Sequence, residues 1–252
     1  MAVRTLKLTT SYDGTAYGGW QRQDNADTVQ GRLEAALAEV EGRRVTVHGA
    51  GRTDAGVHAL GQVASFTLVH PIETLRLARA LNAKLPSDIR VLGVEEADPR
   101  FHARYAAKRK RYRYRIDRAA VASPMERRYA WHVPEALDIQ RMAAAGATLV
   151  GRHDFAAFQT GSSEAGVLST VRTIFDLGVT AESDRLVVVE VEGNGFLRYM
   201  VRAIVGTLVE VGMGRRAADD MAAILASSTR SRAGPTAPAH GLLLVHVDYQ
   251  DA

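Results

Sequence analysis

The sequence predicts an α+β fold in which two βαββαβ halves join into one extended antiparallel sheet with a basic central cleft. Two observations support this prediction. Short stretches of alternating apolar residues are interleaved with longer stretches whose apolar residues recur every three or four positions, as in amphipathic helices. The same order of strands and helices then begins again after Arg104. This order is typical of ferredoxin-like and RRM-like domains, whose helices cover one face of an open sheet.

The first half is expected to span residues 1–104. Its first helix is indicated by the recurrence of Leu33, Leu37 and Val40, and Pro71 and Pro86 mark the two ends of its second helix. The predicted elements are a strand at 5–11, a helix at 28–40, strands at 44–50 and 62–69, a helix at 73–85 and a strand at 89–95.

The second half is expected to span residues 105–252 and to elaborate the same order. Alternation predicts its strands, and helical periodicity predicts its helices. The predicted elements are a strand at 110–117, a helix at 134–148, strands at 171–180 and 186–192, helices at 198–211 and 216–227, and a strand at 242–249.

Composition restricts the class of protein. The chain has 252 residues, of which 46% are hydrophobic, so it can bury a substantial core. It has no cysteine, which excludes disulfides and thiolate chemistry. The first residues lack the apolar core of a signal peptide, and we expect a cytoplasmic protein with no membrane association. The net charge of +4 makes a polyanion a plausible partner.

The positive charge is concentrated between Arg100 and Arg118, where Asp117 is the one acidic residue. Tyr105, Tyr112 and Tyr114 alternate with the cations there. Phosphate-binding cations beside rings that can stack on bases favour single-stranded or unstacked nucleic acid as the ligand. A solvated basic strand face is the alternative interpretation.

One loop carries a candidate catalytic carboxylate. Residues 51–59, Gly-Arg-Thr-Asp-Ala-Gly-Val-His-Ala, lie between two predicted strands and place Asp54 beside Arg52 and a glycine turn. Loops on rigid strands commonly carry catalytic residues. An ordinary turn stabilised by the aspartate side chain is the alternative.

This loop resembles the catalytic loop of the tRNA pseudouridine synthases of the TruA family. Further segments resemble motifs of that family in the same order, and together they cover nearly the whole chain. These segments are residues 12–15, 19–23, 28–31, 101–104, 111–114, 151–155, 195–197, 200–206 and 236–242.

The resemblance implies an isomerase that converts uridine to pseudouridine at positions 38, 39 and 40, in the anticodon stem-loop of tRNA. It also implies a homodimer, and the reaction requires no cofactor and no metal. By the same resemblance, Asp54 is the nucleophile, Arg202 forms an ion pair with it, and Tyr112 stacks on the uracil with a possible role in proton transfer. Arg52, His58 and Leu197 are the further substrate-binding residues. The expected contacts to the tRNA backbone are Lys108, Arg109, Lys110, Arg111 and Arg113.

Two features leave roles open. Tyr114 projects to the same face of a strand as Tyr112, so alternation alone does not say which ring meets the base. Members of the family commonly have a Tyr-His pair where this chain has Arg198 and Tyr199, and the roles of these two residues are not assigned.

Three alternative functions account for parts of the sequence. A non-catalytic RNA-binding protein would account for the basic and aromatic segment equally well, but it gains nothing from a carboxylate aimed among cations. A pseudouridine synthase acting on another RNA is the second. The pair His153 and Asp154 suggests a metal-dependent phosphohydrolase, but further metal ligands at a suitable spacing are missing.

Overall fold

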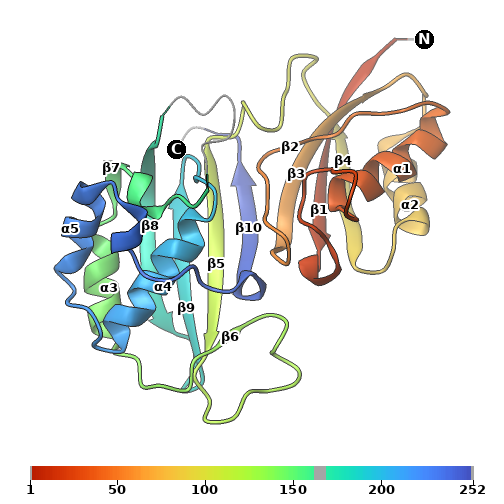
Figure 1. Ribbon diagram of the computed structural model, residues 1–252. Helices are drawn as coiled ribbons and strands as arrows, with labels where there is room; N and C mark the ends of the chain where they lie inside the picture. The colour runs from red at the N-terminus through yellow and green to blue at the C-terminus, as the bar shows by residue number, and fades with distance from the viewer. Residues whose placement is uncertain (1, 162–168, 251–252) are drawn as a thin grey trace. The chain divides into compact units, whose positions relative to one another are not determined.

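The computed structural model describes residues 2–161 and 169–250. It has the predicted α+β class, with helices and strands mixed along the chain (Figure 1). The chain divides into two compact units, Met1–Lys108 with Leu243–Ala252 and Arg109–Leu242, each with its own strands and helices. Among the described residues, no helix is long and apolar enough to cross a membrane.

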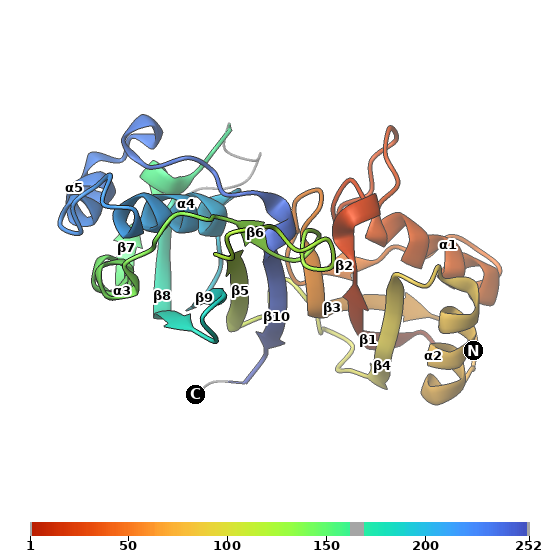
Figure 2. The same ribbon diagram turned by 90° about the horizontal axis from the view of Figure 1, so that it is seen from below.

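Over the residues that the structure describes, the first unit contains four long strands, one short strand and two α-helices. In chain order these are β1 (Arg4–Tyr12), α1 (Val29–Glu41), β2 (His48–Gly49), β3 (His58–Leu68), α2 (Thr74–Lys84), β4 (Ile89–Glu96) and β10 (Leu242–Asp248). The strand order is β4-β1-β3-β10, and β2 pairs with β3. The β1 pairings are antiparallel, as predicted, whereas β10 runs parallel to β3. Helices α1 and α2 lie on the same side of this sheet (Figure 2).

Helix α1 begins and ends at residues whose chemistry favours a helix boundary. The Thr28 hydroxyl oxygen accepts a hydrogen bond from the Gly31 N–H at 3.3 Å, which satisfies one unpaired donor of the first turn. Gly42 follows the last turn with φ of 76°, in the left-handed region that glycine adopts without strain. Leu33 and Leu37 are fully buried, so the predicted apolar stripe of the helix faces the core.

The strand predicted at 44–50 is wrong over most of its length, because only His48–Gly49 pairs with β3. Side chains of α1 replace the missing strand partner. Gln30 Nε2 donates to the Val47 carbonyl oxygen at 3.0 Å, and the Val47 N–H donates to Glu34 Oε1 at 3.1 Å. The alternating apolar residues of this segment therefore reflect its burial and do not indicate pairing in a sheet.

The second unit contains five strands and three α-helices among its described residues. In chain order these are β5 (Arg109–Asp117), β6 (Trp131–His132), α3 (Ile139–Ala147), β7 (Gly151–Asp154), β8 (Val171–Ala181), β9 (Leu186–Gly193), α4 (Met200–Gly212) and α5 (Asp220–Ser227). The strand order is β5-β9-β8-β7, with antiparallel pairs, and β6 runs parallel to β5. Helices α3 and α4 lie along one face of this sheet (Figure 2).

All three predicted helices of the second unit begin later than expected, α4 at Met200 and not at residue 198. Helix α3 begins at Ile139 and not at residue 134, because Asp138 caps it by accepting a hydrogen bond from the Arg141 N–H at 3.0 Å. Helix α5 begins at Asp220 and not at residue 216. The short strands β6 and β7 were not predicted, since segments of two and four residues carry almost no periodicity.

The C-terminal strand belongs to the first unit. The sequence prediction placed all of residues 105–252 in one half, but Leu243 and Leu244 of β10 pair with His58 and Ala59 of β3. Pairing between strands so distant in the chain leaves no local signal, so the order of elements in the sequence does not indicate it. The division after Lys108 lies four residues beyond the predicted one.

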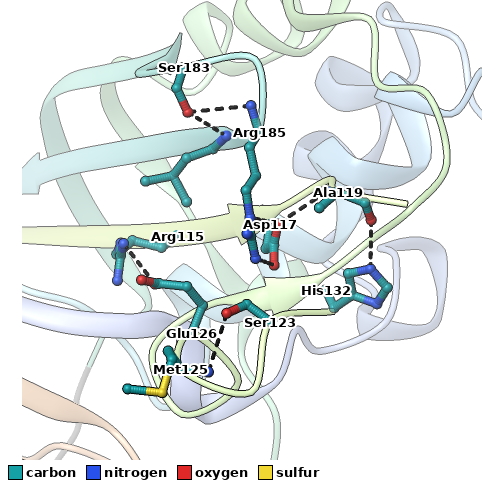
Figure 3. Close-up of polar contacts among 10 residues, drawn as sticks. Arg115, Asp117, Ala119, Ser123, Met125, Glu126, His132, Ser183 and Arg185 are labelled. Atoms are coloured by element: carbon teal, nitrogen blue, oxygen red, sulfur yellow. Dashed lines mark hydrogen bonds and ion pairs between the residues drawn. The ribbon is translucent and has the colours of Figure 1, made fainter. Parts of the chain in front are cut away.

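A buried carboxylate, that of Asp117, lies at the C-terminal end of β5 (Figure 3). Asp117, at the end of β5, has a side chain that is 3% exposed and accepts two hydrogen bonds from the Arg185 guanidinium at 2.8 and 2.7 Å. It also accepts one from the Ala119 N–H at 3.1 Å. The Arg185 bonds and the Ala119 bond outweigh the effect of burial and lower the pKa of Asp117.

We expect Asp117→Asn to lower the free energy of unfolding at neutral pH by about 2 kcal/mol, because an amide N–H₂ would face the Arg185 guanidinium. The folded-state pKa of Asp117 is lowered, so its contribution is complete above the unfolded pKa of about 3.9 and is lost as the pH falls through the folded value. Urea unfolding from pH 7 to pH 3 measures this. Asp98→Asn, at an exposed ion pair with Arg100, is the control. A wild-type to Asp117→Asn difference that stays constant over this pH range would contradict the assignment.

Candidate active site

The loop that carries Asp54 is held at its backbone by the segment after β1. The Trp20 N–H donates to the Thr53 carbonyl oxygen at 3.1 Å, and the Gly56 N–H donates to the Tyr17 carbonyl oxygen at 3.4 Å. Within the loop, the Val57 N–H donates to the Asp54 carbonyl oxygen at 3.1 Å and closes a turn. Asp54 is half-buried. Its position is therefore fixed by hydrogen bonds on both sides of it in the chain.

Buried side chains add to this support. The hydroxyl oxygens of Thr53 and Tyr12 lie 2.8 Å apart, and both side chains are buried. Gln62 Nε2 donates to the Gly51 carbonyl oxygen at 2.8 Å. Burial raises the pKa of Tyr12 to about 12, although its hydrogen bonds to Thr53 and Gln62 oppose the rise. The Tyr12 hydroxyl therefore stays protonated at neutral pH and remains a neutral hydrogen-bonding partner beneath the loop.

His58 and Arg52 flank this loop differently. His58 is buried at the start of β3, where its Nδ1 lies 3.0 Å from the Gly14 backbone nitrogen, which donates to it, and 3.1 Å from Asp13 Oδ1. These contacts give His58 a structural role that joins β3 to the turn after β1. Arg52 is exposed, and its Nε donates to Gln21 Oε1 at 3.1 Å.

Arg202 lies on α4 in the second unit and is tied to the segment before β10. Its Nε donates to the Ala237 carbonyl oxygen at 2.7 Å, and the Ala237 N–H donates to the Arg202 carbonyl oxygen at 3.0 Å. The side chain is therefore anchored both along its length and at its backbone. Such anchoring fixes the direction of a long side chain that would otherwise sample many rotamers.

The Tyr199 ring lies against two guanidinium groups. The Arg202 Cζ is 4.9 Å and the Arg198 Cζ is 5.0 Å from the ring centroid, within the range of cation–π attraction. Tyr199 has φ of 61°, a left-handed conformation that is uncommon for a residue with a side chain. Strain of this kind clusters at functional sites. The structure thus gives Tyr199, whose role the sequence left open, a contact with Arg202.

The two tyrosines of β5 differ in their surroundings. Tyr114 is fully buried, its hydroxyl donates to the Pro238 carbonyl oxygen at 2.7 Å, and a Cβ on Gly241 would lie 2.6 Å from its ring. It is therefore a core residue. Tyr112 is 7% exposed and packs edge-on against Phe196, with ring centroids 5.2 Å apart. Leu197, the next residue after Phe196, is 6% exposed.

The arginines of the basic segment have counter-charges on the neighbouring strand. Arg109 and Arg111 both bind Glu192, at 3.1 and 2.7 Å, and Arg113 binds Glu190 at 3.0 Å. These bonds lower the pKa of Glu192 although burial alone raises it. The sequence around these arginines has Asp117 as its one acidic residue, but antiparallel pairing brings further carboxylates, those of β9, opposite the β5 arginines.

The predicted site residues thus fall into two groups, one in each unit. The first unit holds Asp54, Arg52, His58 and Lys108; the second holds Arg202, Tyr112, Leu197, Arg109, Lys110, Arg111 and Arg113. The sequence predicted no role for several residues that support the site. Tyr12, Gln62 and Ala237 are such residues, and membership of Tyr12 and Ala237 in the quoted motifs was the available signal. His153 and Asp154 bond to the local backbone, at Val150 O and Ala156 N–H.

A protein-family model described as tRNA pseudouridine synthase matches residues 8–106 and 145–250 of this chain. The chain belongs to the tRNA pseudouridine synthase family. The predicted family is therefore confirmed, and with it the class of enzyme, an isomerase acting on tRNA.

Individual relatives of the family match along nearly their whole length. A protein of Acetivibrio thermocellus named tRNA pseudouridine synthase A is 48% identical over 247 residues, which are 98% of this chain and 100% of that protein. Proteins with the same name from a Thermoanaerobacter species and from Myxococcus xanthus are each 46% identical over 98% of this chain, and this covers 100% and 92% of their own lengths.

We expect Gly19→Ala to reduce pseudouridine formation by roughly 100-fold or more, because small displacements of a catalytic group are costly. A Cβ on Gly19 would lie 2.6 Å from the Thr53 carbonyl oxygen and 3.1 Å from the Asp54 carbonyl carbon. Single-turnover assays on tRNA measure the rate. Gly42→Ala is the matched control, since Gly42 also has positive φ but has no atom within 4 Å of the added Cβ. Equal rates for the two variants would show that the Gly19 contact does not position the loop.

Proposed function

We propose that this protein converts uridine to pseudouridine at positions 38, 39 and 40 in the anticodon stem-loop of tRNA. In this reaction the N1–C1′ bond breaks, the uracil turns, and a C5–C1′ bond forms. C5 loses a proton and N1 gains one, so nothing is consumed and no cofactor or metal is required. The proposal rests on family membership together with the half-buried Asp54 on its fixed loop.

Asp54 is proposed as the nucleophile that attacks C1′ while the uracil leaves. A carboxylate in this role must be ionised and aimed at one atom. The hydrogen bonds around Thr53, Val57 and Gly51 support the second requirement, because they fix the loop backbone on both sides of the carboxylate. For the first requirement we propose Arg202 as the cation, because a positive charge near a carboxylate favours its ionised form.

Tyr112 is proposed to stack on the target uracil, with Leu197 beside it. Tyr114 is 0% exposed and its hydroxyl is bonded to Pro238, whereas Tyr112 is 7% exposed, and this difference favours Tyr112 in this role. The stacked uridine of a folded tRNA must be extruded to be reached, at a cost of a few kcal/mol. We propose that exposed Arg52 occupies the position that the base vacates. His58 is proposed to support the loop through its hydrogen bond with the Gly14 N–H.

Contacts to the tRNA backbone are proposed for the five cations from Lys108 to Arg113. The three arginines have to exchange a carboxylate partner on β9 for phosphate, which reduces the gain from each contact. Lys110 lies on the same face of β5 as Tyr112, because residues two apart in a strand share a face. Lys110 is therefore the cation of this segment best placed to contact the phosphate of a nucleotide whose base lies at Tyr112.

Wild-type protein should form pseudouridine in unmodified tRNA with neither metal nor nucleotide added, as mapped by carbodiimide modification. Asp54→Asn should lower the rate by roughly 10⁴-fold or more, because it removes the nucleophile. Arg202→Met should also abolish turnover, and both variants should bind tRNA nearly as tightly as the wild type. Tight binding without product in the wild type would favour a non-catalytic RNA-binding protein, and product confined to other RNAs would change the substrate. A fully active Arg202→Met variant would remove that residue from the site.

The protein is further proposed to act as a homodimer, with one tRNA contacting both subunits. The support is the resemblance to the family and the large size of tRNA relative to a chain of 252 residues. Size-exclusion chromatography with light scattering should give twice the chain mass of 27.3 kDa at micromolar concentration. A monomer that remains fully active under the same conditions would overturn the shared-tRNA arrangement.

A further inference from the structure

Three rings of the first unit form a continuous stack that the reaction does not use. His48 on β2 and His102 have ring centroids 4.8 Å apart, and His102 and Tyr105 have centroids 4.3 Å apart, with interplanar angles of 35° and 31°. Tyr105, at the end of this stack, is 80% exposed. We propose that the stack of His48, His102 and Tyr105, the ring stack, binds an unpaired nucleobase of the tRNA substrate, at a site separate from Tyr112. This inference rests on the proposed function, which makes tRNA the ligand.

The segment that presents Tyr105 is held in place before any ligand binds. The Ala103 N–H donates to Ser65 Oγ on β3 at 3.0 Å, and the Tyr249 hydroxyl donates to the Ala103 carbonyl oxygen at 2.9 Å. The Ala106 N–H donates to the His102 carbonyl oxygen at 3.0 Å and closes the turn. A ring on a fixed turn loses little conformational entropy when a base stacks on it, which favours binding.

The chemistry around the rings suits a nucleotide. His102 Nδ1 accepts a hydrogen bond from the Arg104 N–H at 3.2 Å, so this nitrogen carries no proton. Burial, together with the nearby His48 ring and the positive charge of Arg104, lowers the pKa of His102, which favours the neutral form of its ring. Arg104 is exposed beside the stack. A cation next to stacked rings, with a base on the rings and phosphate at the cation, is the pattern by which proteins hold unpaired nucleotides.

Tyr105 is also the tyrosine of the basic segment that is open to a ligand without rearrangement. Tyr112 and Tyr114 are 7% and 0% exposed, so an RNA strand on the surface meets neither ring face, and Tyr112 is proposed to meet only the extruded uracil. Isolated exposed apolar residues are common and need no explanation. Tyr105 differs from such residues because its ring already stacks on another ring and lies next to Arg104 in the chain. The cationic surroundings favour RNA over an apolar protein surface as the occupant.

The first test compares tRNA affinity and single-turnover rate for Tyr105→Ala and the wild type. Loss of one base–aromatic stack predicts that the dissociation constant for unmodified tRNA rises roughly 5- to 150-fold. The rate at saturating enzyme should stay at the wild-type value, because Tyr105 does not touch the reacting uridine. Tyr105→Phe and Tyr105→Trp should retain tight binding, since they keep the ring. Leu92→Ala is the matched control for loss of exposed apolar surface, because Leu92 is 60% exposed on β4 of the same unit.

A second measurement locates the base. Single nucleotides of the anticodon stem-loop are replaced in turn by 2-aminopurine, and one position should show fluorescence quenching by the wild type that Tyr105→Ala abolishes. If Tyr105→Ala binds tRNA as tightly as the wild type, the ring stack is not an RNA site, and the proposed function is untouched if the wild type makes pseudouridine. If the wild type makes none but Tyr105→Ala still weakens binding, the ring stack stands and the proposed function fails.

Discussion

Hydrogen bonds from buried and half-buried side chains to loop backbones are the constraint on which the candidate site depends. The loops that contain Gly51, Ala103 and Ala237 lack strand partners, and an unpaired buried backbone group is costly. Side chains supply the missing partners: Gln62 bonds to Gly51, Ser65 to Ala103, and Arg202 to Ala237. Each of these loops therefore has its backbone bonded to a side chain of the same unit.

The same constraint explains why polar residues occur in the core of the first unit. Gln30, Glu34 and Gln62 are buried, and each bonds to the backbone of the segment from Val47 to Gly51 or of its neighbours. Replacing such a residue by an apolar one would leave backbone groups without partners in the core. Polar groups in the core of this unit thus serve the loop that leads to Asp54.

Charge in the second unit is arranged by strand pairing. Alternation along β5 places its arginines on one face and Tyr112, Tyr114 and Ile116 on the other, where they are buried. Antiparallel pairing with β9 then brings Glu190 and Glu192 opposite Arg113 and Arg111. The segment with the highest positive charge in the sequence is consequently an ion-paired surface. The cation beside the ring stack, Arg104, lies before this strand begins.

The sequence alone determined the α+β class, most element positions, the family and the loop that carries Asp54, because periodicity, caps and motifs are local in the chain. Tertiary structure decided what depends on residues far apart in sequence. It assigned β10 to the first unit through its pairing with β3, and it replaced a predicted strand by side-chain bonds from α1. It also separated buried Tyr112 and Tyr114 from exposed Tyr105. Burial and ion pairing depend on which segments are in contact in the folded chain, and the linear sequence pattern does not specify those contacts.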